Sequence, residues 1–174
     1  MDPGPQLYPH GETTVIDPDV IAFLEGRRVA VSISSRNEHC IPSVTRALGY
    51  RISADRRQFA IFVITRQSER VLSDLRGTAQ AAVVFTEPST HKSVQVKGSD
   101  ARITPLEEGD WPVISTYADE LVAEICPLGY PEPLIRKMTE CTPQQAVAVR
   151  FTPTAAFGQT PGPRAGAALS ESKP

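Results

Sequence analysis

The stretch between residues 29 and 103 contains several short apolar runs separated by only a few turn residues, and this spacing constrains the fold more than any other feature. Residues 29–34 alternate apolar and small polar side chains, as in a strand with one buried face. Phe59–Ile64 is apolar throughout, which predicts a central strand covered on both faces. Short turns join antiparallel strands, whereas parallel strands need long crossovers. The sequence therefore predicts a mainly β fold with inserted helices and mostly antiparallel strands.

The other strand signals complete a chain of at least six strands. Further strands are predicted at residues 42–51, 81–85, 93–103 and 146–151. Gly98 falls inside one of them and indicates a bulge or a close backbone approach. Short turns favour a barrel over a doubly wound sheet. We expect an extended arm at residues 1–19, the strand-rich domain at 20–151 and an extended, Pro/Gly-rich tail at 152–174.

Helices are predicted between the strands from capping residues and apolar periodicity. Ser68 is typical of an N-cap and Gly77 of a C′ residue, which predicts a helix between them. Thr104 followed by Pro105 and Glu107 predicts the start of another, which Pro112 divides into two pieces. Short helices are also expected at residues 20–24 and 131–138.

The formal net charge of −2 is unevenly distributed along the chain. Residues 21–103 carry 13 bases and 7 acids, whereas both flanking segments are acidic. The near-neutral total argues against a general nucleic-acid binder, and the basic middle favours a small anionic ligand. No apolar run is long enough to span a bilayer, and because the first residues lack a basic segment followed by an apolar core, we expect no secretory signal.

Cysteines and histidines give little support for metal or thiol chemistry. Cys126, Cys141 and Cys40 form no CxxC pair, so we expect a reduced cytoplasmic protein without a zinc site or a disulfide framework. Cys40 follows His39 directly, but neighbours on a strand point to opposite faces. We therefore interpret this pair as a turn histidine and a buried cysteine.

The turn between the buried strand and the helix predicted after it suits an anion. Thr65, Ser68 and Arg70 lie where a helix begins, and backbone N–H, hydroxyl and guanidinium groups there favour a phosphate. A solvated capping turn is the simpler interpretation of the same residues. Arg46, two strands away in a barrel, offers a second positive contact, or it is an edge arginine in water. Ser93, Gln95 and Lys97 form a polar strand face that either meets solvent or lines a ligand groove.

The order of these elements resembles the pyridoxamine 5′-phosphate oxidase-like family of FMN-binding split barrels. The matching pieces are residues 40–47, Phe59–Thr65 followed by Ser68-Glu69-Arg70, residues 81–85 and residues 93–98. The resemblance implies a six-stranded antiparallel split β-barrel that forms a homodimer. It also implies an FMN held in a groove between the subunits, where residues of both chains contact it.

The resemblance carries site residues over by position. Arg46, or Thr45 if the register shifts by one, corresponds to the basic residue of the second strand. Val63, Ile64 and Thr65 correspond to the strand end that meets the flavin, Ser68 and Arg70 to the phosphate turn, and Gln95 or Ser93 to the polar position before the glycine. No acid or base stands out, and no metal is expected.

Two departures limit the function that the resemblance implies. Glu69 lies beside Arg70 where the oxidases have adjacent basic residues. The C-terminal Arg and His set that binds pyridoxal in true oxidases has no match after Phe151. We therefore expect an FMN-dependent oxidoreductase with an unidentified small substrate and not a true pyridoxamine phosphate oxidase. The alternatives are a non-catalytic module for FMN, another phosphorylated cofactor or haem, and a barrel retained only as a dimeric interaction protein.

Overall fold

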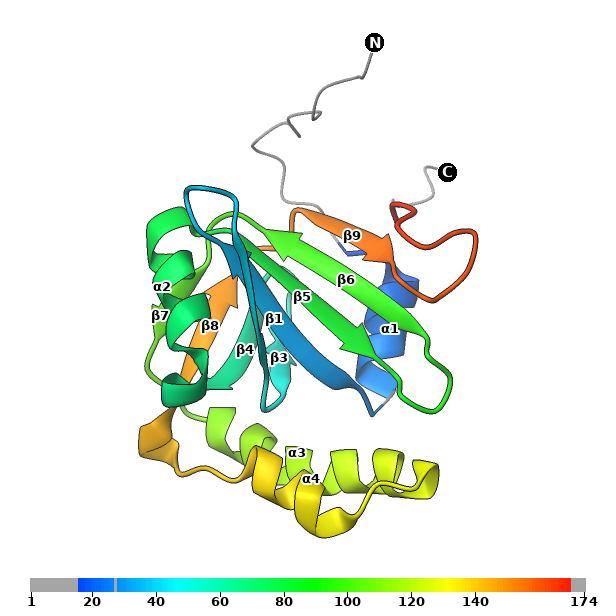
Figure 1. The fold of residues 1–174 in the computed structure, drawn as a ribbon. Helices are drawn as coiled ribbons and strands as arrows, with labels where there is room; N and C mark the ends of the chain where they lie inside the picture. Colours follow the sequence, from blue (N-terminus) through cyan, green and yellow to red (C-terminus); the bar gives the residue numbers. More distant parts are fainter. Residues whose placement is uncertain (1–15, 27, 170–174) are drawn as a thin grey trace.

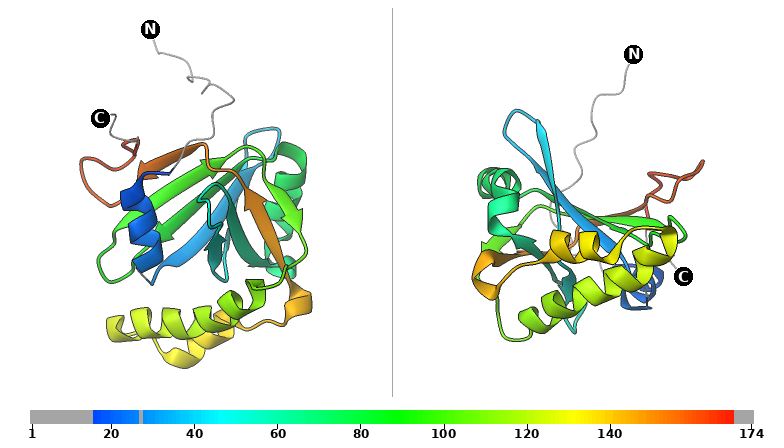
Figure 2. Two further views of the ribbon diagram at one scale, coloured as in Figure 1. Left: turned by 180° about the vertical axis from the view of Figure 1, so that it is seen from behind. Right: turned by 60° about the horizontal axis from the view of Figure 1, so that its bottom comes forward.

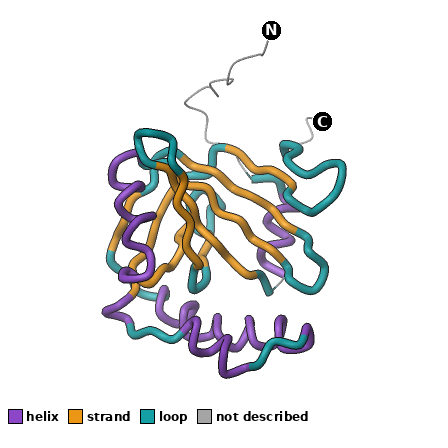
Figure 3. The backbone as a smooth tube through the Cα atoms, in the orientation of Figure 1, coloured by secondary structure: helices purple, strands orange, loops and turns teal. Residues whose placement is uncertain are grey.

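The computed structural model describes residues 16–26 and 28–169, and these form two antiparallel sheets with helices around them (Figures 1 and 3). One sheet has the order β2-β1-β5-β6-β9 and the other β3-β4-β8-β7. The strands are β1 (Ala30–Arg36), β2 (Pro42–Arg46), β3 (Tyr50–Ile52), β4 (Phe59–Ile64), β5 (Ala81–Thr86), β6 (Ser93–Gly98), β7 (Arg102–Thr104), β8 (Ala146–Phe151) and β9 (Ala155–Gly158). The helices are α1 (Pro18–Gly26), α2 (Glu69–Thr78), α3 (Asp110–Ile125) and α4 (Glu132–Thr139), with short 3₁₀ segments η1 (Thr65–Ser68), η2 (Cys126–Leu128) and η3 (Pro143–Gln145).

The predicted fold class is confirmed as a mainly β protein with antiparallel strands and inserted helices. The finer prediction of a six-stranded split barrel is not, because the described residues form nine strands in two sheets and no closed barrel. Two differences come from the ends of the predicted strands. The second predicted strand is interrupted at residues 47–49, where Gly49 has φ of 117°, and continues as β3 in the other sheet. The segment expected as an extended tail contributes β9, which pairs with β6.

The two sheets share one apolar core. Inward-facing side chains of β1 and β5 meet those of β4 and β8, and the rings of Phe59 and Phe85 lie 5.9 Å apart. Phe59 also stacks on Phe151 at 5.6 Å. Helix α1 lies on the same side of the five-stranded sheet as the second sheet (Figure 2), and its Phe23 and Leu24 belong to this core. Every residue of β4 is buried, as predicted for a central strand, because α3 covers its outer face.

Gly98 lies at a close approach between the sheets, one of the two outcomes predicted for it. A Cβ atom at this position would overlap the ring of Phe151 and lie 2.6 Å from the carbonyl oxygen of Thr152. Both neighbours are fixed, since Phe151 is buried in the core and the other contact is backbone. The strand passes from one sheet to the other just after this glycine.

Gly77, in contrast, lies inside α2 and not at the predicted C′ position. The helix ends one residue later, and Ala79 is the residue with positive φ, 54°. The N–H of Ala79 donates to the carbonyl oxygen of Leu75 at 2.8 Å. A Cβ atom on Gly77 would meet no other atom within 4 Å.

The prediction that a helix begins at Thr104 is wrong, and a buried carboxylate explains why. Thr104 stays in β7, where its hydroxyl accepts a hydrogen bond from Nε of Arg150 at 3.1 Å. Helix α3 begins instead at Asp110, which is fully buried and pairs with Arg150 at 2.6 Å and with Arg51 at 2.9 Å. Two guanidinium groups thus fix the helix start, and Pro112 falls in the first turn, where it does not break the helix.

The two glycines predict opposite effects of the same substitution. Gly98→Ala should lower the free energy of unfolding by about 1–3 kcal/mol, because the added methyl group has no space. Gly77→Ala should raise it by about 0.5–1 kcal/mol, because alanine is the better helix former and the site is open. Urea unfolding of both variants against the wild type measures the difference. Equal effects of the two substitutions would contradict the close approach at Gly98.

Candidate functional site

One face of the five-stranded sheet carries no helix of residues 16–26 or 28–169. Figure 1 looks onto this face, with α1 behind the sheet and α3 and α4 below it. The strand registers place the following half-buried or exposed residues on this face, which we call the open face: Ser32, Ser34, Val44, Arg46, Ala82, Val84, Gln95, Lys97, Ala155 and Phe157. The four central members are small or short, and no Asp or Glu belongs to the set. The open face is therefore shallow, uncovered and cationic.

The end of β2 brings some of the predicted site residues together. Thr45 points to the side of the sheet opposite the open face, where its hydroxyl lies 3.1 Å from that of Ser68. Ser68 immediately precedes α2 and is buried, yet its side chain makes no capping hydrogen bond. The predicted capping role is thus wrong, and the hydroxyl of Ser68 connects β2 to the helix start instead.

Two arginines lie within two residues of this hydroxyl pair in the sequence, and Asp74 on α2 accepts a hydrogen bond from Ser43 on the same face of β2 as Thr45. Arg46 follows Thr45 directly and extends from the other face of the strand, while Arg70 lies in the first turn of α2, and both are exposed. β2 is an edge strand, and its inner face is covered at Ser43 and Ser68, which are buried. We call Thr45, Arg46, Ser68 and Arg70 the rim. Thr65, which begins η1, is exposed beside them.

The charge of Arg46 also acts on a tyrosine of α3. The hydroxyl of Tyr117 on α3 accepts a hydrogen bond from the N–H of Val31 at 3.1 Å. Burial raises the pKa of Tyr117 to about 12, and the positive charge of Arg46 acts against this shift.

The remaining predicted residues lie apart from the rim. Val63 and Ile64 are buried at the end of β4, just before η1. Their side chains therefore face the protein interior and not a ligand. Gln95 lies on the open face, three strands away from β2. Ser93 is buried at the start of β6, where its hydroxyl bonds to that of Thr86 at 2.9 Å. The candidate residues thus form a rim and a separate group on β6.

Sequence reasoning missed two residues that the C-terminal segment adds to the open face. Phe157 on β9 is paired with Gln95 in the strand register. Gln159 donates from Nε2 to Oε1 of Gln95 at 3.4 Å. These residues belong to the Phe157-Gly158-Gln159 sequence after the last predicted strand. Proline and glycine follow it, and for that reason the sequence predicts an extended tail there.

Cys40 does not have the environment that the sequence predicts. The prediction that Cys40 is buried is wrong, because it lies exposed in the β1–β2 turn with φ of 61°. Its Sγ is 3.7 Å from Nη1 of Arg36.

Within residues 16–26 and 28–169, no three His, Cys, Asp or Glu side chains gather as a metal ion would require. No helix in the same residues has the length and apolar character needed to cross a membrane.

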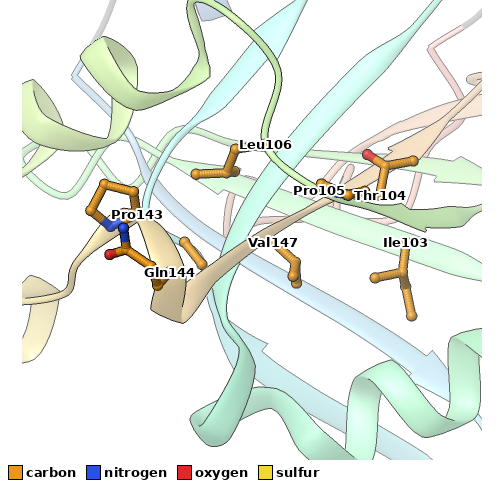
Figure 4. Close-up of a pocket in the computed structure, with 8 residues that line it drawn as sticks. Ile103, Thr104, Pro105, Leu106, Pro143, Gln144 and Val147 are labelled. Atoms are coloured by element: carbon orange, nitrogen blue, oxygen red, sulfur yellow. The ribbon is translucent and has the colours of Figure 1, made fainter.

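A further groove lies across the strand pair from the end of β4, since Ala146 and Val147 in its lining pair with Ile64 and Val63. It has a volume of about 510 Å³ and lies beside β7 and the start of β8 (Figure 4). Its lining is Ile103, Thr104, Pro105, Leu106, Pro143, Gln144, Ala146 and Val147. None of these side chains is charged, and none belongs to the predicted site. We therefore base the candidate site on the rim and the open face.

Comparison with known proteins identifies similar folds. No family model matches the chain, and no curated protein matches its sequence. Among solved structures, an FMN-binding protein from Nostoc punctiforme related to pyridoxamine 5′-phosphate oxidase is 13% identical, with 84% of this chain and 85% of that chain covered and a TM-score of 0.47. An F420 reductase is 16% identical, with 76% and 92% covered and a TM-score of 0.48. The heme storage protein HutZ from Vibrio cholerae is 11% identical, with 82% and 94% covered and a TM-score of 0.46.

One of these structures is described as related to pyridoxamine 5′-phosphate oxidase, the family that the order of motifs resembles. The names of these three proteins refer to FMN, F420 and heme, so the similarity does not select one cofactor.

The hydroxyl pair at the rim leads to a prediction about stability. Ser68→Ala should lower the free energy of unfolding by about 1 kcal/mol, because Ser68 is buried and the Thr45 hydroxyl loses its partner. Thr45→Val should have a similar cost, and the double variant should lose less than the two single losses added together. Chemical unfolding of the four proteins of this cycle measures the coupling. Strict additivity would show that the two hydroxyls do not interact.

Proposed function

We propose that this chain is an FMN-binding flavoprotein of the pyridoxamine 5′-phosphate oxidase-like split-barrel family. In this proposal it acts as a homodimeric oxidoreductase on a small molecule, in the cytoplasm. The observation that carries the proposal is the rim: two guanidinium groups and two hydroxyls around the free end of β2, next to an uncovered sheet face. Three unpaired thiols agree with a reducing compartment.

The chemistry of the rim fits a phosphate monoester. Arg46 and Arg70 offer planar guanidinium donors, which suit phosphate oxygens and form charge-assisted hydrogen bonds. Thr45 and Ser68 bond to each other; the hydroxyl of half-buried Thr45 can rotate to donate to an anion, while buried Ser68 holds it from behind. Glu69 is exposed at the first position of α2, where it remains in water. The predicted phosphate role of the rim therefore agrees with the donors present.

The open face fits a flat ring. Ser32, Ser34, Ala82 and Val84 occupy its two central strands and project little above the backbone. A planar molecule lying on such a face contacts backbone and small side chains over its whole area. Gln95 supplies an amide at the margin, with both donor and acceptor groups for a heteroaromatic edge. When bound, FMN would supply the electron or hydride transfer, and the chain would bind and orient it.

A second copy of the chain is the proposed cover for the open face. Val44 is 70% exposed there, although it lies in the middle of β2. A ligand on a shallow face of one subunit remains mostly in solvent, whereas a second subunit laid over it excludes water. The proposed flavin site therefore includes residues of both copies.

The cofactor is tested by the ligand that the protein retains. Mass spectrometry of material released from the purified protein should detect FMN, and the protein should be yellow. Haem in place of FMN would support the non-catalytic binding alternative. A colourless protein that does not bind added FMN would overturn the proposal.

Arg70 provides a sharper test of the phosphate contact. Arg70→Glu should weaken FMN binding by at least about tenfold, because it replaces a phosphate donor by an anion. Arg76→Glu is the matched control, since Arg76 is exposed on the last turn of the same helix. Fluorescence titration with FMN measures both dissociation constants. Equal affinities for the two variants would remove Arg70 from the site.

The proposed dimer depends on the open face. Val44→Lys should convert the dimer to a monomer at the same protein concentration, because it adds a cation beside Arg46 on a face that a second copy would bury. Leu134→Lys is the control, since Leu134 is 49% exposed but lies on α4. Light scattering after size exclusion gives the mass. A dimer that tolerates Val44→Lys would place the interface elsewhere.

A further inference from the structure

Lys97 is a cation on the open face whose neighbours leave it without a counter-charge. Its Nζ lies 4.7 Å from the centroid of the Phe157 ring. Its cross-strand neighbours are alanines on both sides, Ala82 on β5 and Ala155 on β9. Among the ion pairs of the described residues, none involves Lys97. The aromatic ring holds the ammonium group in place, and the small neighbours leave room beside it.

One amide lies on the same face as this cation, and a second amide contacts the first. Gln95 is two residues before Lys97 on β6, so both side chains project from the same face. Gln159 contacts Gln95 through a single hydrogen bond of 3.4 Å, which is long for this type of bond. Each amide has two donor hydrogens and two acceptor lone pairs, so most of this capacity remains available to a ligand.

The phosphate proposed for the rim is too distant to neutralise Lys97. In the five-stranded sheet, β6 lies three strands from β2, which carries Arg46. Strands are spaced by about 4.8 Å, so the two strands that carry these cations are about 14 Å apart across the sheet. One phosphate group does not span that distance. If a second subunit covers this face, Lys97 is buried, and a buried ammonium group needs an anion of its own.

We propose that Lys97, Phe157, Gln95 and Gln159 form a binding subsite for an aromatic carboxylate. The proposal deepens the proposed function, on which it rests, by naming the substrate class of the same face. One ammonium group matches the single charge of a carboxylate, whereas a phosphate dianion suits the two guanidinium groups of the rim. Phe157 supplies apolar contact for a ring, and the amides supply hydrogen bonds to a ring nitrogen.

Matched pairs of acid and amide probe molecules test the subsite. Isothermal titration calorimetry is run with benzoate and nicotinate, and with benzamide and nicotinamide as neutral equivalents of the same shape. The wild type should bind each acid at least tenfold more tightly than its amide. Nicotinate should bind more tightly than benzoate, because only nicotinate has a ring nitrogen for Gln95 or Gln159.

Two variants test whether the effect is specific to Lys97 or arises from the loss of any lysine. Lys97→Gln should weaken nicotinate binding at least tenfold and abolish the preference for the acid. Lys92→Gln is the matched control, because Nζ of Lys92 also lies over a phenylalanine ring, 4.8 Å from the centroid of Phe23, but precedes β6 and is not on the open face. Its affinity for nicotinate should stay within twofold of that of the wild type.

The outcomes distinguish this subsite from the proposed cofactor site. Absence of binding by all four probes, equal binding of acids and amides, or an unchanged affinity in Lys97→Gln overturns the subsite. FMN titration of the same variants is the second measurement. Retained FMN binding with lost nicotinate binding in Lys97→Gln supports two separate anion positions. Nicotinate binding by a protein that never binds FMN supports the subsite and overturns the proposed function.

Discussion

Burial of β4 on both faces is the constraint on which the rest of the fold depends. Its odd-numbered residues face the core shared by the two sheets, and its even-numbered residues pack under α3. A strand that is apolar on both sides needs cover on both sides. The five-stranded sheet covers one side of β4, and α3 covers the other. The five-stranded sheet is covered on its inner side by α1, α2 and the other sheet (Figures 1 and 2). Its outer side is left as the open face.

Local signals in the sequence predicted the strands well because alternation and apolar runs determine them directly. β1, β4, β5 and β8 lie where the pattern places them. The failures occur where a distant contact decides the structure. Asp110 begins α3 because two arginines from β3 and β8 meet it, and neither is near it in sequence. Thr104 does not cap a helix, because its hydroxyl accepts a hydrogen bond from Arg150 instead.

The site was predictable in its residue types but not in its grouping. The sequence pointed to Thr45, Ser68 and Gln95, yet it did not show that the first two would bond to each other. Gln95 lies with Phe157, which the sequence assigns to a tail without structure. Strand order, which no local pattern encodes, decided both arrangements. The basic residues in the middle of the chain are likewise divided between two positions on the open face, because Arg46 and Lys97 lie three strands apart.

The position of Thr45 and Arg46 on opposite faces of the edge strand makes the length of the hairpin turn between β1 and β2 a determinant of ligand chemistry. Side chains alternate along a strand, so loss of one residue from that turn exchanges the two faces of β2. The cation would then lie against α2, and the hydroxyl would lie on the open face. Related chains with a turn one residue shorter or longer are therefore expected to differ in the anion that they accept, even where every rim residue is retained.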